Sequence, residues 1–329
     1  MLSSFTIAGW GAYRPRRVVT SAALDAVHGH DAGWTEGKFG IASRHVAEPD
    51  ETSSMMGAAA ARAALDRAGW ADGEFDALIG GCGVMEQPIP STATLVQARL
   101  GLGASGIPAF DVNQTCLSFM AALDVAAMGI ACGRWRRVLV FSSDIASAGL
   151  DTSDPKIRSI FGDGAAAVAL EAGEASGLLV SRFVTHGDHH ALAQLRAGGT
   201  RLRVEEGYEA LVAGSHFEMD AFGIFKAAAK ALPGVIDGAL ADAGMVRGDL
   251  DCVICHQASA PGVEHVRRLF ASHEALVIDI FATHGNQIAA SIPTALAHAL
   301  DSGMAKRGDR VMLLGTAAGI SAGAMVLQL

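Results

Sequence analysis

The chain has 329 residues, half of them hydrophobic, with 39 glycines and a formal net charge of −9 at pH 7. This length can bury a large core as two domains or as one large α/β unit. The negative charge argues against nucleic acid or an anionic membrane as the main partner, so an acidic partner would need a local basic patch. Mean hydropathy is +0.31, yet no uninterrupted apolar stretch reaches the roughly 18 to 20 residues that a membrane-spanning helix needs.

The first residues lack the charge order of a secretory signal. Residues 1–9 hold no basic side chain, and Arg14, Arg16 and Arg17 follow the apolar residues instead of preceding them. The five cysteines are odd in number and irregularly spaced, which indicates a reducing compartment and no disulfide framework. We therefore expect a soluble, cytoplasmic protein.

Metal-binding patterns in the chain are weak. Cys252 and Cys255 match Cys-x-x-Cys, but they fall in a strand-like apolar run, where positions three apart face opposite sides. The histidines of residues 186–190 are typical of a solvated loop. We expect no metal site.

An internal repeat predicts the architecture. Residues 64–79 read as helix, short turn and buried strand, and the pattern returns without a gap at 239–254, an offset of 175. A second pairing, at an offset of 173, matches the helix after Cys116 with the helix after Asn286, each followed by an apolar strand. Two such matches in the same order indicate a duplicated α/β unit with a pseudo-twofold axis.

The boundary between the two units is expected where an apolar strand runs into a polar, glycine-rich stretch. Residues 171–177 have this composition and predict a turn. The chain then divides into an N-terminal half, residues 1–172, and a C-terminal half, residues 173–329. Residues 185–218 are richer in charge, His and Gly, and predict a surface excursion near the mouth of the active site.

Three side chains follow strand-like runs and together form a catalytic set. Cys116 lies at the corner between such a run and an alanine-rich helix, where the partial positive charge of a helix start favours the nucleophilic thiolate. That thiolate could accept an acyl group as a thioester. His256 and Asn286, if they converge on Cys116, would offer two N–H donors to one carbonyl oxygen and stabilise an enolate. Gly285 suits a turn that brings backbone close to the site.

The same residues also fit a cysteine hydrolase, in which the histidine is the base and the asparagine orients it. The two chemistries differ in whether water reaches the thioester. The glycines and alanines around these motifs predict a dry site, which favours acyl transfer.

The sequence resembles the ketoacyl-acyl carrier protein synthase III enzymes of the thiolase superfamily, essentially end to end. The resemblance implies an α/β thiolase-like fold of two pseudo-twofold-related halves in a five-layer arrangement. It also implies a homodimer that uses thioester substrates and no metal or redox cofactor. It rests on Asp111-Val112 leading to Cys116, Phe161-Gly162-Asp163-Gly164-Ala165, Phe225-Lys226, His256-Gln257-Ala258, and His284-Gly285-Asn286 followed by Ala289-Ala290-Ser291-Ile292-Pro293.

Carried over position by position, the resemblance implies roles for the site residues. Cys116 would be the acylated nucleophile, and His256 and Asn286 would bind the malonyl thioester carbonyl and promote decarboxylation. The oxyanion hole would be the Cys116 backbone N–H and one from the final turn at Ala318 and Gly319, which has fewer glycines than the family pattern.

Positions outside the catalytic set, in the CoA clamp and on the carrier-protein surface, depart from the family pattern. Trp34 matches the tryptophan that stacks on the CoA adenine, but Lys38 replaces the arginine of that clamp. The basic surface for acyl carrier protein corresponds here to Lys226, Arg267 and Arg268. These departures indicate a specialised homologue.

Ile89 stands where short-primer members insert a phenylalanine from the partner subunit to close the acyl pocket. Isoleucine is smaller, which predicts a pocket that accepts medium or long acyl chains. The alternative is that Ile89 only packs in a dimer core.

The leading functional prediction is a decarboxylating Claisen condensation of an acyl-CoA primer with malonyl-acyl carrier protein. Head-to-head acyl condensation, or acyl transfer in secondary metabolism, would keep Cys116 and change the second substrate. The intact His256 and Asn286 favour condensation with malonyl, because transfer needs no enolate. An alternative of another class is a non-catalytic partner subunit, which Ser259 in place of the family's asparagine keeps open.

Overall fold

A nine-stranded sheet runs through the protein, and one long strand, β7 (Gly164–Thr185), belongs to both of its halves. The computed structural model describes residues 2–329. The first part of β7 pairs antiparallel with β6 and β1, and its last part pairs antiparallel with β13. The other strands of the first half are β1 (Ser3–Tyr13), β4 (Ala77–Gly80), β5 (Ala109–Asp111) and β6 (Arg137–Asp144), and those of the second are β10 (Cys252–Cys255), β11 (Leu276–Ile278), β12 (Arg310–Ala317) and β13 (Ser321–Gln328).

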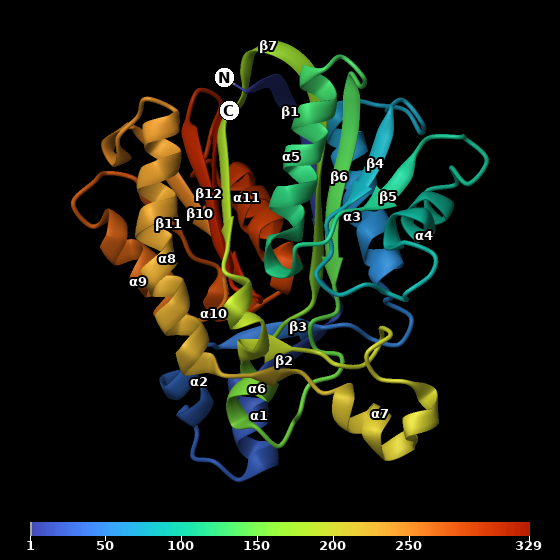
Figure 1. The fold of residues 1–329 in the computed structure, drawn as a ribbon, viewed down its shortest axis with the longest axis vertical. Helices are drawn as coiled ribbons and strands as arrows, with labels where there is room; N and C mark the ends of the chain where they lie inside the picture. The colour runs from blue at the N-terminus through green and yellow to red at the C-terminus, as the bar shows by residue number, and fades with distance from the viewer. Residues whose placement is uncertain (1) are drawn as a thin grey trace.

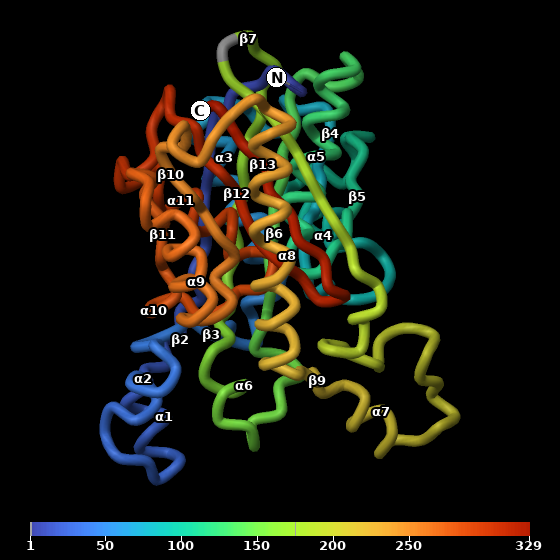
Figure 2. Tube along the Cα trace, turned by 60° about the vertical axis from the view of Figure 1, so that its left-hand side comes forward, coloured from blue at the N-terminus to red at the C-terminus, as the bar shows by residue number. Residues whose placement is uncertain are grey.

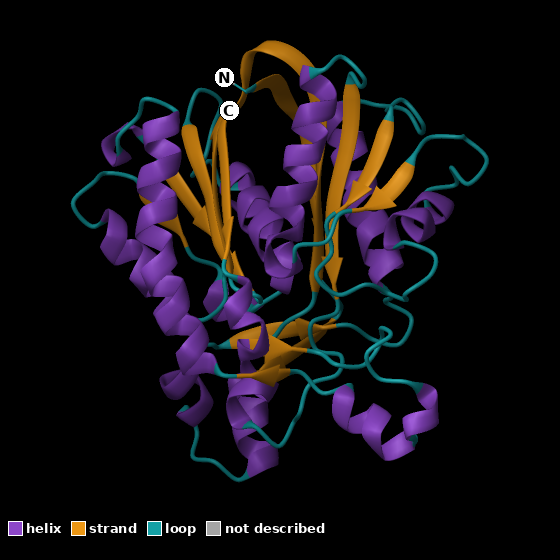
Figure 3. Ribbon diagram, in the orientation of Figure 1, coloured by secondary structure: helices purple, strands orange, loops and turns teal. Residues whose placement is uncertain are grey.

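Helices cover the outer faces of the two half-sheets and fill the space between them (Figures 1 and 3). Two sheet layers and three helical layers make the five-layer, thiolase-like α/β arrangement that the resemblance implies. The central layer holds α5 (Ser118–Ala131) and α11 (Ser291–Asp301), while α3 (Ser53–Ala68) and α4 (Thr92–Arg99) cover the first half-sheet and α8 (Ala221–Asp242) and α9 (Ala260–Phe270) cover the second.

Close packing between the layers explains the composition. Strands β4 and β10 are buried throughout, so they read as continuous apolar runs without alternation. A Cβ on Gly9 of β1 would lie 2.1 Å from the carbonyl oxygen of Ala64 in α3. The many glycines and alanines therefore let helices lie directly on strands.

The internal repeat is confirmed at the level of the elements. Helix α5 begins at Ser118 and α11 at Ser291, an offset of 173, and strands β6 and β12 follow at the same offset. Each helix is preceded by a 3₁₀ turn, η1 (Thr115–Leu117) or η5 (Ile288–Ala290), whose first residue has a φ of +48° or +51°. Both corners are thus built alike.

The prediction of a turn at residues 171–177 is wrong. Strand β7 continues through it, and its register against β1 jumps from Ala172 opposite Phe5 to Gly177 opposite Ser4. The polar run is a bulge in a long strand that arches over the end of the molecule (Figure 2). A boundary between residues 172 and 173 would therefore fall inside a strand and not in a linker.

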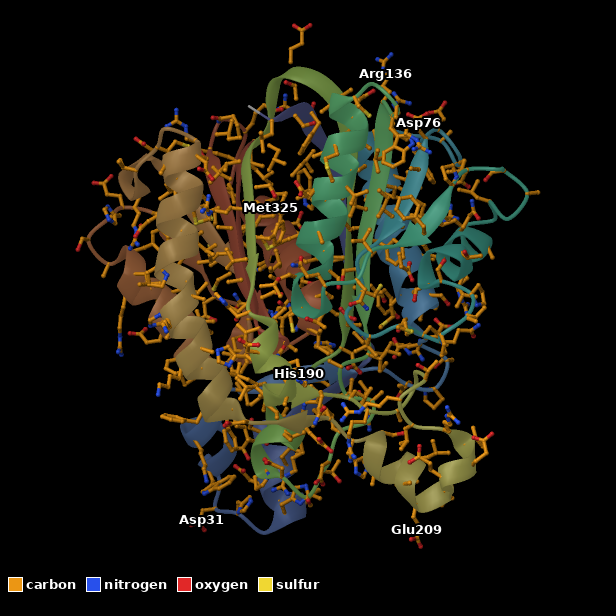
Figure 4. The ribbon with its side chains drawn as sticks, viewed as in Figure 1. Asp31, Asp76, Arg136, His190, Glu209 and Met325 are labelled. Carbon is orange, nitrogen blue, oxygen red and sulfur yellow. The ribbon has the colours of Figure 1, made fainter. Side chains whose placement is uncertain are left out.

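Short elements gather at the opposite end of the molecule. Figure 4 shows Asp31 and Glu209 at this end, with Asp76 and Arg136 at the other. Residues 185–218 form the excursion that their composition predicts (Figure 1). No helix within residues 2–329 combines the length and the apolar character needed to cross a membrane. The short elements are β2 (Arg17–Thr20), α1 (Ser21–His28), α2 (Trp34–Phe39), β3 (Ser43–Val46), α6 (Pro155–Ile160), η2 (Gly187–Leu192), β8 (Ala193–Gln194), η3 (Val204–Glu206), α7 (Tyr208–Gly214) and β9 (Glu218–Met219), and elsewhere η4 (Arg247–Asp249) and α10 (Phe281–His284).

Candidate active site

One cavity of about 340 Å³ is lined by all three candidate catalytic side chains. Cys116 comes from η1 just before α5, His256 follows β10, and Asn286 follows α10. The turn after β12 contributes Ala318 to the same wall. Corners from both halves of the repeat therefore meet at one cavity.

The remaining walls of the cavity are mainly apolar. Helix α8 supplies one side, and residues 193–195 and Phe217 of the excursion supply another together with the following Met219, so the excursion lies at the site as expected. Such walls exclude water from a reacting thioester. The larger apolar side chains are Leu150, Ile160, Phe161, Leu195, Phe217, Met219, Ile224, Phe225, Leu232 and Val266.

His256 is held by a buried hydroxyl. Its Nδ1 lies 2.6 Å from Ser291 Oγ, and the backbone N–H of Gln257 donates to the same oxygen over 3.3 Å. His256 is 8% exposed. Burial lowers the pKa of His256 to about 4, so its imidazole is neutral at physiological pH.

Asn286 is oriented by the turn that follows it. Its Oδ1 accepts from the Ile288 N–H over 2.9 Å, and its Nδ2 makes a long contact of 3.4 Å to the Ala258 carbonyl. The backbone N–H of Asn286 donates to the Ile160 carbonyl. Gly285 has a φ of +69°, and a Cβ there would lie 2.6 Å from the Ile160 oxygen. The expectation that a glycine lets the backbone approach closely here is confirmed.

The Cys116 thiol lies in surroundings that oppose its ionisation. Burial raises the pKa of Cys116 to about 12, and the Asp144 carboxylate adds to the increase. The backbone N–H groups of Ala318 and of Cys116 itself act in the opposite direction. The bias towards thiolate that the helix start predicts is therefore outweighed by burial. Cys116 lies on a short 3₁₀ turn, where the field at the start of α5 does not outweigh burial.

Asp144 is a functional candidate that the sequence analysis missed. Its carboxylate is fully buried at the end of β6 and accepts from the backbone N–H groups of Gly83, Val84 and Ala290 over 2.6 to 3.0 Å. Burial raises the pKa of Asp144 to about 7, although these donors lower it. The residue ties the loop after β4 to η5, and only its place at a strand end could have drawn attention to it.

The proposed nucleotide position lies on the α1–α2 hairpin. The His30 ring stacks on Trp34 with centroids 3.8 Å apart, and the Lys38 ammonium lies 4.4 Å from the indole centroid. Arg158 of α6 lies 3.2 Å from His30 Nε2. Sequence reasoning found Trp34 and Lys38 but missed His30, because a stacking partner four residues earlier has no distinctive pattern.

The remaining predicted positions lie on the surface. Ile89 is 86% exposed and does not line the cavity of its own chain. Lys226 is exposed on α8, beside the cavity-lining Phe225. Arg267 and Arg268 on α9 are partly neutralised, by Asp279 at 2.8 Å and Glu264 at 3.0 Å respectively. Within residues 2–329 no group of His, Cys, Asp or Glu is arranged to hold a metal ion.

A cysteine, a neutral histidine and an asparagine on one apolar cavity, within a five-layer duplicated α/β fold, define the thiol-dependent condensing enzymes. Family models agree: residues 110–187 match 3-oxoacyl-[acyl-carrier-protein] synthase III, residues 240–329 match its C-terminal region, and residues 38–147 match the thiolase N-terminal domain.

Known proteins match over nearly the whole chain. The beta-ketoacyl-[acyl-carrier-protein] synthase III of Neisseria meningitidis serogroup C is 35% identical over 98% of both chains. The crystal structure of 3-oxoacyl-[acyl-carrier-protein] synthase III from Aquifex aeolicus matches with a TM-score of 0.88 and 30% identity, covering 99% of this chain and 100% of that one. The priming beta-ketosynthase of the R1128 polyketide biosynthetic pathway also matches, with a TM-score of 0.88 and 27% identity over 99% of this chain and 96% of that one.

The chain therefore belongs to the beta-ketoacyl-[acyl-carrier-protein] synthase III family. It is an acyltransferase-type condensing enzyme.

Proposed function

We propose that Cys116 takes an acyl group from a primer thioester and that a malonyl thioester then extends it. In the first step, the Cys116 sulfur attacks the primer carbonyl, the C–S bond of the primer thioester breaks, and the proton of Cys116 leaves with the primer's thiol. In the second, malonyl loses CO2, and the resulting carbanion attacks the acyl-enzyme to release a β-ketoacyl thioester and free Cys116. The observation that carries this proposal is the presence of Cys116, His256 and Asn286 on one apolar cavity.

The polar groups fit the charges that form in these steps. The N–H groups of Cys116 and Ala318, which lie at the sulfur, would stabilise the oxyanion of acyl transfer, with Gly319 shaping the turn. The neutral His256 and the Asn286 amide would donate to the malonyl thioester oxygen as the enolate develops. One such donor typically contributes about 3 to 4 kcal/mol to the transition state.

The apolar walls and the surface positions support a proposal for the primer and the partners. The walls favour a medium or long acyl chain, with Ile89 of one subunit facing the pocket of the other in a homodimer. Trp34 and Lys38 would bind the nucleotide of acyl-CoA. Lys226, Arg267 and Arg268 would meet acyl carrier protein, whose malonyl group is the second substrate.

Intact mass after brief exposure to acyl-CoAs of graded length tests the first step, with Cys116→Ala as control. We expect an adduct on the wild type that increases with chain length and is absent from the variant. An adduct from acetyl-CoA alone would retain acylation and remove the long-chain proposal.

Release of CO2 from malonyl-acyl carrier protein by the acylated enzyme tests the second step. The likeness to a priming ketosynthase of a polyketide pathway favours a specialised pathway as an alternative setting. Acylation of Cys116 without CO2 release would point to head-to-head condensation or acyl transfer. If neither step occurs, the chain is a non-catalytic partner subunit.

A further inference from the structure

Ser291, the first residue of α11, connects the central helix to the candidate histidine. Its side chain is fully buried, and its Oγ lies 2.6 Å from His256 Nδ1. The backbone N–H of Gln257 donates to the same oxygen over 3.3 Å. No other hydrogen-bond partner of this hydroxyl is found among residues 2–329.

The number of protons in this cluster determines the tautomer of the imidazole. A serine hydroxyl has one proton to donate, and the Gln257 N–H can only donate. If the single ring proton of the neutral His256 were on Nδ1, then Nδ1–H and the Gln257 N–H would both donate to Ser291 Oγ. The proton of the Ser291 hydroxyl would then have no acceptor. A buried donor without a partner costs about 1 to 3 kcal/mol. The favourable arrangement has the Ser291 hydroxyl donating to Nδ1.

We infer that Ser291 is a positioning residue that holds His256 in the Nε2–H tautomer, so that the imidazole acts as a hydrogen-bond donor and not as a base towards Cys116. This inference rests on the proposed function for the identity of the acceptor, the malonyl thioester oxygen. It also disfavours the cysteine hydrolase chemistry, in which the histidine must take the thiol proton.

The η5 turn orients the second donor as well. The Ile288 N–H holds Asn286 Oδ1 at 2.9 Å, which leaves Nδ2 as the end of the amide that can donate. Ile288 reaches this position with a φ of +51°, unusual for a β-branched residue. Ile288 of η5 and Ser291, three residues later at the start of α11, thus set the donor groups of Asn286 and His256 respectively.

Ser118, the residue equivalent to Ser291 in the first half of the repeat, makes different hydrogen bonds. Ser118, at the start of α5, is equally buried. Its Oγ donates to the Thr115 carbonyl over 2.7 Å and accepts from the Gln114 N–H over 2.8 Å. Both serines accept a backbone N–H, Ser118 from Gln114 just before its own helix and Ser291 from Gln257 after β10. Only Ser291 directs its proton to an imidazole.

Ser291→Ala tests the inference, with Thr294→Ala as matched control. Thr294 lies one turn further along α11, is 3% exposed, and its hydroxyl has no hydrogen-bond partner in the described chain. Long-range ¹H–¹⁵N spectra report directly which ring nitrogen of His256 carries the proton. We expect an Nε2–H pattern in the wild type and in Thr294→Ala, and a mixture of tautomers in Ser291→Ala.

The two half-reactions supply the second readout. Ser291→Ala should acylate Cys116 at the wild-type rate but release CO2 from malonyl-acyl carrier protein about tenfold more slowly, the value of one hydrogen bond. Ser291→Thr, which keeps the hydroxyl, should restore most of this loss. An unchanged Nε2–H pattern in Ser291→Ala, or equal loss of acylation and CO2 release, would overturn the inference. The tautomer measurement needs no substrate, so it decides the role of Ser291 even if the proposed reaction fails.

Discussion

The pKa of Cys116 depends on a carboxylate outside the three candidate catalytic residues. Asp144 raises the pKa of Cys116 in addition to burial, yet its carboxylate also ties together the backbone of Gly83, Val84 and Ala290. The same carboxylate thus makes the thiol less acidic and fixes the backbone around the site. With the pKa of Cys116 near 12, the proposed acylation requires the thiol to lose its proton as the acyl group arrives.

We predict that Asp144→Asn makes Cys116 more reactive towards iodoacetamide. Removing the negative charge lowers the pKa of Cys116, and each unit gives tenfold more thiolate below the pKa, so roughly three- to tenfold faster alkylation is expected at pH 8. In both proteins the rate should increase with pH from 7 to 9, because this range lies below the pKa of about 12.

Asp163→Asn is the control for that experiment. Asp163 is also fully buried and accepts the N–H groups of Ala47 and Ser147, but the carboxylate that raises the pKa of Cys116 is Asp144. Alkylation in Asp163→Asn should stay at the wild-type rate. An Asp144→Asn variant that is folded and no more reactive than the wild type would show that burial alone sets the pKa.

The α1–α2 hairpin presents a preformed aromatic surface. Asp25 accepts the backbone N–H groups of Gly33 and Thr35 over 2.9 and 3.0 Å, which fixes the residues on either side of Trp34. The His30 ring then covers one face of the indole at 3.8 Å. A nucleobase that uses this face has to displace the imidazole.

We therefore predict that His30→Ala lowers KM for acyl-CoA. An aromatic pair is worth about 0.5 to 1.5 kcal/mol, and the base no longer has to break the His30–Trp34 pair, so a decrease of roughly two- to tenfold is expected. The KM for the same acyl group on phosphopantetheine, which lacks the nucleotide, should not change. The neighbouring exposed His28 gives a control variant, and an equal effect on both substrates would mean that the adenine does not use this face.

Some elements could be predicted from the sequence and others could not. Strands β4 and β10 could be predicted because burial on both faces leaves an apolar run in the sequence. The bulge in β7 could not, since a polar, glycine-rich run is typical of a turn, and the pairing that continues the strand joins the ends of this run, Ala172 and Gly177, to β1 and β13. At the site, Cys116, His256 and Asn286 follow from motifs, whereas Asp144, Ser291 and His30 act through contacts across the fold that local sequence does not encode.

At the scale of the whole molecule, the two halves share one core. The central apolar cluster contains Phe119 and Leu123 from α5 together with Ile292 and Leu296 from α11, all at most 1% exposed. Strand β7 contributes to both half-sheets. Neither half could bury its central helix alone, and each large apolar side chain left in water costs about 1.5 to 3 kcal/mol.

We predict that the protein unfolds in one cooperative transition despite its duplicated architecture. The four tryptophans, at positions 10, 34, 70 and 135, all lie in residues 1–172, so their fluorescence follows the N-terminal half, whereas far-UV circular dichroism follows both halves. The urea midpoints from the two signals should coincide. Leu296→Ala, a change in the C-terminal half, should shift both midpoints equally through a loss of about 2 to 5 kcal/mol. A shift confined to circular dichroism would mean that the halves unfold separately, and that the shared helical layer does not couple the corner of Cys116 to the corner of Asn286.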